Sequence, residues 1–195
     1  MDGWTHTFGM PELKEDLLRA RPLEILALLP VGILCGVLMG AVTNAINGVV
    51  SPAYFSLLFW DWKAQDDFEL WRFTIEQGML EGSVFGAVFS LILMFGIAFI
   101  SKLRCPFRPG FIVLLKVMAF SLMFWIVGGF NGALLAQFLP QFSNLGLLFN
   151  PGEALRFAWV AGSIWGVYIG SLLSTIGAFV SFAAKWRRLE KEART

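Results

Sequence analysis

Long apolar runs alternate with short islands of charged residues along this chain. A helix that crosses a lipid bilayer needs about 20 apolar residues. Each uncharged run is long enough for one such helix, and Pro52 and Pro140 end the helices of the two longer runs. The pattern therefore predicts four spanning helices. The uncharged runs lie between Glu24 and Asp61, Glu81 and Lys102, Lys116 and Glu153, and Arg156 and Lys185.

We expect an all-α fold, an integral membrane four-helix bundle built from two tandem helical hairpins. Leu13, Leu17 and Leu18 share one face of a helix before the first span, which predicts an amphipathic helix at the membrane surface. Pro30 predicts a kink in the first span. The expected parts are a tail at 1–22, a membrane domain at 23–184 with helices at about 23–47, 78–101, 110–137 and 155–184, an interfacial aromatic loop at 53–77, and a charged tail at 185–195.

Composition supports lipid as the main solvent of this chain. Apolar residues make up 57% and charged residues 15%, and the mean hydropathy is +0.69. Soluble domains average about 45–50% apolar and about 25% charged residues. The net charge of +1 gives no electrostatic reason to expect a nucleic-acid partner. One histidine and two cysteines exclude a bis-histidine haem, a four-cysteine metal cluster and a disulfide framework, and we expect no cofactor.

Lysine and arginine are distributed unevenly between the two sides of the predicted bundle. Eleven lie in the two tails and the loop between the second and third spans, and three lie on the opposite side. Because basic residues are enriched in cytoplasmic loops, both termini are expected in the cytoplasm of a bacterial-type inner membrane. The three on the opposite side are Lys63, Arg72 and Arg156.

The sequence contains an internal repeat with a constant offset of 84 residues. Arg72-Phe73 and three following glycines match Arg156-Phe157 and three further glycines without a gap. More loosely, Asn44 matches Asn131, because both lie the same distance beyond an Arg-Pro pair. The match predicts a duplicated hairpin, at about 21–104 and 108–188, whose copies point the same way around an axis along the membrane normal. The alternative is that the glycines arose independently.

Three of the predicted helices carry a glycine at every fourth position. In lipid, helices associate through close backbone approach, and such a strip permits it. We expect the strips to pack helix against helix inside the bundle; the alternative is that one strip is an outer dimer face. The strips are Gly32, Gly36 and Gly40; Gly78, Gly82 and Gly86; and Gly162, Gly166 and Gly170.

Polar residues gather near the extracytoplasmic ends of the helices, where intramembrane polar groups point to function. They predict a small pocket around Asn44, Asn47 and Glu81. The alternative is ordinary hydrogen bonding between helices, with one acid near the headgroups. No acid–base pair, nucleophile with a base or phosphate-binding loop is present, so we expect no enzyme. The candidate pocket residues are Asn44, Asn47, Glu76, Gln77, Glu81 and Asn131.

Aromatic residues alternate with acids in the loop after the first span. One interpretation is a short helix at the headgroup level, where tryptophan and tyrosine are enriched. The other is a docking ledge for another membrane subunit, since exposed aromatic residues favour interfaces. The candidate interface residues are Tyr54, Phe55, Trp60, Trp62 and Trp71.

One segment resembles a motif of uncharacterised bacterial multi-span membrane proteins. The residues that carry the resemblance are Gly40, Asn44, Ile46 and Ser51-Pro52-Ala53-Tyr54-Phe55. In the similar proteins, a His-Asp-Gln triplet is followed by Ser-Pro-Glu-Tyr-Phe. Here Thr43, Asn44 and Ala45 occupy the triplet positions, and Ala53 replaces the glutamate. The resemblance covers about 16 of the 195 residues and implies a multi-span architecture.

Together these features predict a non-enzymatic accessory or scaffold subunit of a membrane complex. Its expected partners are the lipid bilayer and another membrane subunit or a second copy of itself. The alternative is a small transporter or channel that uses the polar pocket on the extracytoplasmic side. The shortage of polar residues along the depth of the bilayer argues against that alternative.

Overall fold

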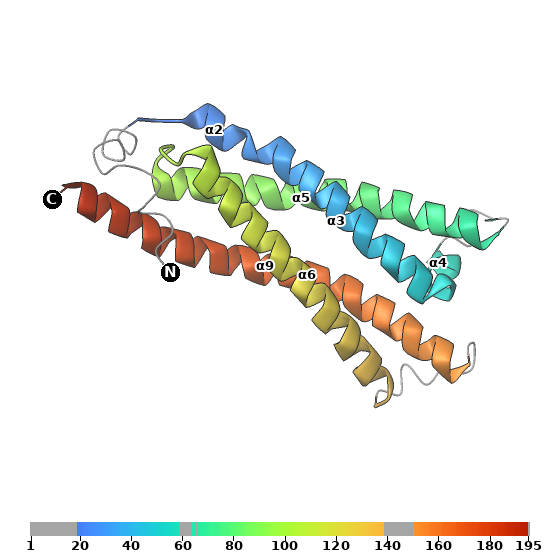
Figure 1. Ribbon diagram of the computed structural model, residues 1–195. Helices are drawn as coiled ribbons and strands as arrows, with labels where there is room; N and C mark the ends of the chain where they lie inside the picture. The colour runs from blue at the N-terminus through green and yellow to red at the C-terminus, as the bar shows by residue number, and fades with distance from the viewer. Residues whose placement is uncertain (1–18, 59–63, 65, 139–149, 195) are drawn as a thin grey trace.

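The computed structural model of the chain describes residues 19–58, 64, 66–138 and 150–194, and this part of the chain is helical without any strand (Figure 1). Four stretches are long and apolar enough to cross a membrane: Pro22–Val50, Asp67–Ser101, Phe107–Ala136 and Pro151–Glu192. The helices are α2 (Pro22–Leu26), α3 (Leu28–Val50), α4 (Pro52–Leu58), α5 (Asp67–Ser101), α6 (Phe107–Ala136) and α9 (Pro151–Arg194).

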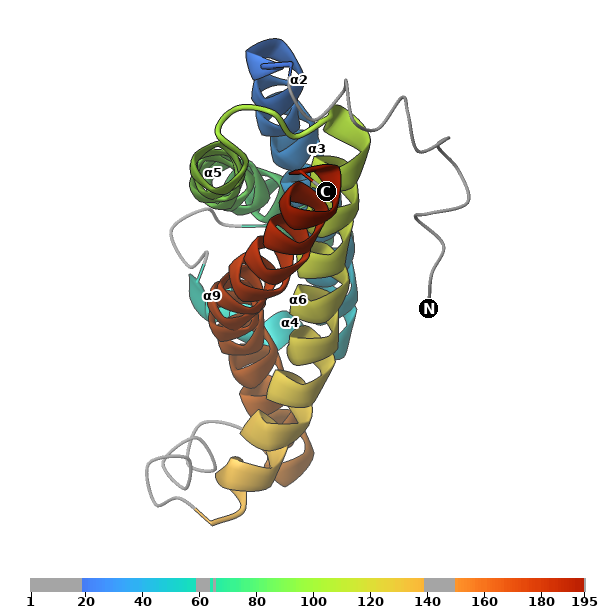
Figure 2. The same ribbon diagram turned by 90° about the vertical axis from the view of Figure 1, so that its left-hand side faces the viewer.

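The four long helices form two hairpins. The first hairpin is α3 packed along α5, and the second is α6 packed along α9 (Figures 1 and 2). In the first, a Cβ atom on Gly36 would overlap the carbonyl oxygen of Gly82, and one on Gly40 would overlap that of Gly78. The second hairpin has the same kind of contact between Gly128 and Gly162. Glycine therefore lets each pair of helices meet backbone against backbone.

The two hairpins contact each other less extensively than the helices within each hairpin do. An apolar cluster joins the hairpins at one end of the molecule. This end holds α2, the turn between α5 and α6 and the last turns of α9 (Figure 1). Side chains from all of these elements are buried together there. The buried members are Ile25, Leu28, Leu93, Met94, Ile97, Cys105, Leu114, Phe182 and Trp186.

The short helix α4 lies at the opposite end, where it contacts α3, α5 and α9 (Figure 1). Phe55 is buried against Leu70 of α5 and Val160 of α9. The ring of Tyr54 packs on that of Phe157, with centroids 4.9 Å apart. Helix α4 thus connects the two hairpins at this end.

The helices extend beyond the bounds expected from hydropathy. α5 begins at Asp67, eleven residues before the expected start at 78, because Asp66 caps it by accepting a hydrogen bond from the Glu69 N–H at 2.8 Å. The expected loop at 53–77 is therefore mostly helix. α9 continues past the expected end at 184, and Trp186 in that extension is buried.

The first span is interrupted at Ala27, between α2 and α3. The interruption lies just before Pro30, whose missing N–H leaves the carbonyl of Leu26 without its helical donor. The third span begins at Phe107 and ends at Ala136, close to the expected 110–137. The predicted surface helix around Leu13 and Leu17 lies outside the described residues.

Candidate functional site

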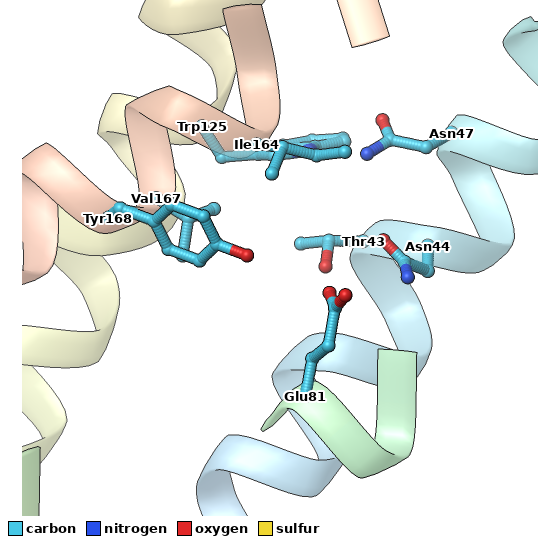
Figure 3. A pocket seen from close by; sticks show the side chains of 8 residues that line it. All are labelled: Thr43, Asn44, Asn47, Glu81, Trp125, Ile164, Val167 and Tyr168. Atoms are coloured by element: carbon cyan, nitrogen blue, oxygen red, sulfur yellow. The ribbon is translucent and has the colours of Figure 1, made fainter. Parts of the chain in front are cut away.

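A small cavity of about 40 Å³ lies between the two hairpins (Figure 3). A cavity needs roughly 10–15 Å³ to hold one water molecule, so this one has room for more than one. Each of the four long helices contributes to its wall. The lining residues are Thr43, Asn44 and Asn47 from α3, Glu81 from α5, Trp125 from α6, and Ile164, Val167 and Tyr168 from α9.

A larger cavity of about 210 Å³ adjoins the small one. The two share Asn44, Glu81, Ile164 and Tyr168 as lining residues. Helix α4 supplies a further part of the wall, so the large cavity lies toward the end of the molecule that α4 occupies. Its lining residues are Asn44, Tyr54, Phe55, Leu58, Gln77, Glu81, Ile164, Trp165 and Tyr168.

Two asparagines of α3 attach this helix to its neighbours. The Nδ2 of Asn44 donates to the carbonyl oxygen of Thr74 in α5 at 3.3 Å. The Oδ1 of Asn47 accepts a hydrogen bond from the Ser163 hydroxyl of α9 at 3.2 Å. Asn47 is fully buried. Since its partner lies in α9, this bond joins the two hairpins beside the small cavity.

Two buried N–H donors at the small cavity have no partner in the structure. They are the Nδ2 of Asn47 and the Nε1 of Trp125. The Asn47 amide nitrogen points toward the side of the cavity where Trp125 lies (Figure 3). A buried donor without an acceptor costs about 1–3 kcal/mol, so both groups would be stabilised by an acceptor atom brought within hydrogen-bond distance.

The carboxylate of Glu81 points into the same space, and the Tyr168 hydroxyl approaches it from the other hairpin (Figure 3). Gln77 donates to the Oε1 of Glu81 at 2.8 Å, one helical turn away. Within the part of the chain that the structure describes, the ion pairs Arg21–Glu24 and Arg72–Glu76 both lie apart from Glu81. The carboxylate thus faces the cavities with an amide as its hydrogen-bond partner.

Tyr54 provides a second phenol at the large cavity. Burial raises the pKa of its hydroxyl, and the nearby negative charge of Glu81 raises that pKa further. The group therefore stays protonated at neutral pH and can donate a hydrogen bond.

The structure brings together four of the six polar residues predicted for the pocket. The four that line the cavities are Asn44, Asn47, Gln77 and Glu81. Glu76 and Asn131 are both exposed, and Glu76 pairs with Arg72 at 3.5 Å. Neither Glu76 nor Asn131 therefore lines either of these two cavities.

The contributions of α6 and α9 to the pocket were missed. Trp125 and Tyr168 belong to the second hairpin, whose residues at the 84-residue offset are apolar where the first hairpin is polar. The polar residues of the prediction therefore came from the first hairpin, with Asn131 as the exception. A tryptophan within a span is a weak signal of a site, because its ring also packs well in a core.

The aromatic residues predicted to form a docking ledge face the protein where they are described. Tyr54 and Phe55 line the large cavity. The Nε1 of Trp71 donates to the carbonyl oxygen of Ala45 at 3.0 Å. Trp60 and Trp62 lie outside the described residues.

The described residues contain no group of three or more histidine, cysteine or acidic side chains that could hold a metal ion. Comparison of the chain with protein-family models, with curated proteins and with solved structures found no match. The chemistry of the pocket therefore carries the functional argument. The residues that carry the two unpartnered N–H donors, the Glu81 carboxylate and two phenols line the two adjoining cavities.

Proposed function

We propose that this chain is a non-enzymatic, four-span membrane protein that binds a small polar solute between its two hairpins and acts as a small transporter. The observation that carries this proposal is the meeting of Asn47, Glu81 and Trp125, from three helices and both hairpins, around one cavity. A pocket formed by two separately packed units can open and close when those units move.

Membrane insertion is supported by large apolar side chains on the outside of the long helices. Examples are Leu34, Phe95, Ile169 and Val180, each more than half exposed. A soluble protein rarely leaves such large apolar patches in water, whereas lipid solvates them. With both termini cytoplasmic, α4 and the large cavity lie on the extracytoplasmic side of a bacterial inner membrane.

Matching glycine contacts support a duplicated hairpin. Gly78 meets Gly40 and Asn44 across the first hairpin, and Gly162 meets Gly128 and Gly132 across the second. Matching residues of α5 and α9 are 84 positions apart, as Gly78 and Gly162 are. By these contacts, matching residues of α3 and α6 are 88 positions apart, as Gly40 and Gly128 are. Asn44 therefore corresponds to Gly132 and not to Asn131. Two parallel copies with a site at their interface are a common architecture of transporters.

One end of the interface between the hairpins contains cavities, and the other end is filled by side chains. A transport cycle needs a state of this kind, in which a site can be reached from one side of the membrane only. Cavities lie beside α4, while the opposite end is filled by the apolar cluster around Leu28, Ile97 and Phe182. In the proposed cycle this state admits solute from the extracytoplasmic side. Rocking of the hairpins would separate the cluster and close the pocket.

The segment that resembles other bacterial multi-span proteins contributes directly to the cavities. Thr43 and Asn44 line the small cavity, and Tyr54 and Phe55 line the large one. We propose that proteins carrying the fuller form of this motif place it beside a pocket in the same position.

The accessory or scaffold role stays a prediction. The features that suggested it, the glycine strips and the described aromatic residues, are occupied by contacts within the chain. A stable complex with another membrane subunit, or with a second copy, would have to use other surfaces. Purification from native membranes in mild detergent tests this: a defined co-purifying partner would favour the scaffold role over transport.

Solute binding and flux test the transport proposal directly. The purified protein is screened by thermal shift against cationic, anionic and neutral small solutes, and hits are measured for uptake into proteoliposomes. We expect at least one class to raise the melting temperature of the wild type and of Glu76→Gln, but not of Glu81→Gln. Absence of any shift and any flux across all classes would refute the proposal.

A further inference from the structure

We propose that the pocket is selective for small organic ammonium compounds that also carry a hydrogen-bond acceptor, such as amino alcohols. This inference rests on the proposed function and specifies the class of solute. It combines three observations: the charge of Glu81, the aromatic wall of the large cavity, and the two unpartnered donors of the small cavity.

The carboxylate of Glu81 calls for a positive charge. It points into the cavities from a helix long and apolar enough to span a membrane, and its hydrogen-bond partner is the neutral amide of Gln77. A carboxylate that lines a cavity of low dielectric constant attracts a cation more strongly than it would in bulk water. No ion pair of the described chain supplies that cation. A cationic solute would supply it.

The walls of the large cavity favour an organic cation. Tyr54, Phe55, Trp165 and Tyr168 line it together with Glu81. Aromatic rings attract ammonium groups through their negative faces, and alkyl groups on the nitrogen add apolar contact. Such a wall would give apolar contact to the methyl groups of an alkylammonium ion whose charge lies beside the carboxylate.

The small cavity adds the requirement for an acceptor. Its unpartnered donors, the Asn47 Nδ2 and the Trp125 Nε1, lie beyond the shared residues Asn44 and Glu81. A hydroxyl or carbonyl oxygen attached to the ammonium by a short chain would accept from them. A bare metal cation would instead meet the positive ends of two N–H dipoles, which disfavours it at this position.

Choline and two analogues separate these requirements. Choline carries both the charge and the hydroxyl, tetramethylammonium lacks the hydroxyl, and 3,3-dimethylbutan-1-ol replaces the charged nitrogen by carbon at nearly the same shape. Binding of each to the full-length protein in detergent is measured by isothermal titration calorimetry. The same titrations are made on Glu81→Gln, on Trp125→Phe, and on Glu76→Gln as the matched control outside the pocket.

We expect choline to bind at least about tenfold more tightly than its neutral analogue, because only choline satisfies the carboxylate. Glu81→Gln should remove most of this difference, and Glu76→Gln should keep it. Choline should also bind more tightly than tetramethylammonium, and Trp125→Phe should reduce that second difference. The comparison among three ligands on the wild type needs no variant and so stands even if a variant does not fold.

Equal binding of choline and the neutral analogue would overturn the assignment to cations. If none of the three binds while another class in the thermal-shift panel does, this inference fails and the proposed function stands. If no solute of any class binds, both fail. Equal binding of choline and tetramethylammonium would overturn the requirement for an acceptor.

Discussion

The carboxylate of Glu24 accepts a hydrogen bond from the backbone N–H of Phe107 at 2.8 Å, although 83 residues separate the two in sequence. Phe107 is the first residue of α6, where N–H groups lack helical acceptors. The same carboxylate accepts from Arg21 at 2.7 Å, and the Arg21 N–H donates to the carbonyl oxygen of Leu103. Glu24 thus caps a helix of the second hairpin from the start of the first span.

Replacing Glu24 by alanine should lower the free energy of unfolding by about 1 kcal/mol, since an N-terminal cap is worth about 0.5–2 kcal/mol. Unfolding of the purified protein in mixed micelles of mild detergent and dodecyl sulfate measures the change. Glu76→Ala is the control, because its ion pair with Arg72 is more than half exposed on both sides and should contribute about 0.5 kcal/mol or less. Equal effects of the two variants would contradict the capping role.

The substitution Gly36→Ala should destabilise the first hairpin by about 1–3 kcal/mol. Its new Cβ atom would overlap backbone atoms of Gly82 and Gly86, so the two helices would have to separate. Gly177→Ala is the matched control, because a Cβ atom there meets nothing within 4 Å. It should be neutral or slightly stabilising, as expected from helix propensity. The same unfolding assay compares both, and a neutral Gly36→Ala would refute the close contact.

Cys105 should resist alkylation in the folded protein. Its side chain is fully buried, and burial raises the pKa of its thiol to about 12. The reactive thiolate is then about 10⁻⁵ of the population at pH 7, and this fraction rises tenfold for each pH unit until the pKa. Maleimide labelling of the Cys35→Ala variant, followed by mass spectrometry, measures the rate before and after denaturation.

A suitable control adds Lys102→Cys to the Cys35→Ala, Cys105→Ala background, since residue 102 is exposed in the turn after α5. This exposed thiol should react fast in the folded state. Rapid labelling of folded Cys105 at neutral pH would show that the turn opens readily.

Reporter fusions should place both ends of the chain in the cytoplasm. Four spanning helices return the chain to its starting side, and the excess of lysine and arginine in the tails sets the orientation. Green fluorescent protein fused before residue 1 or after residue 195 should fluoresce, and alkaline phosphatase fused at either place should be inactive. An insertion after residue 64 should give the opposite pair of results. Termini on opposite faces would contradict a four-span topology.

Hydropathy and charge were sufficient to predict the four long helices, because uncharged runs of this length have few alternatives in lipid. The same reasoning predicted α5 and α9 to be too short, because the ends of these helices carry charged residues and so lie outside the apolar runs. The Asp66 cap and the Asn150-Pro151 start are local signals that could have corrected both.

The pocket was predictable on one side only. Asn44, Asn47 and Glu81 could be identified because polar groups are rare in such helices, while Trp125 and Tyr168 depend on how the hairpins pack. Asn131 is exposed, whereas the next residue, Gly132, is buried against α9. One step along a helix turns a side chain by about 100°, which separates these two positions.

The backbone-to-backbone seams have a consequence for how the protein is made. Each seam joins helices that follow one another in the chain, so a newly synthesised span meets its partner as soon as the next one leaves the ribosome. Low contact order of this kind favours fast assembly. If the helices enter a membrane in chain order, each hairpin can form its own seam before the other is complete, and the pocket between them can form only once both are in place.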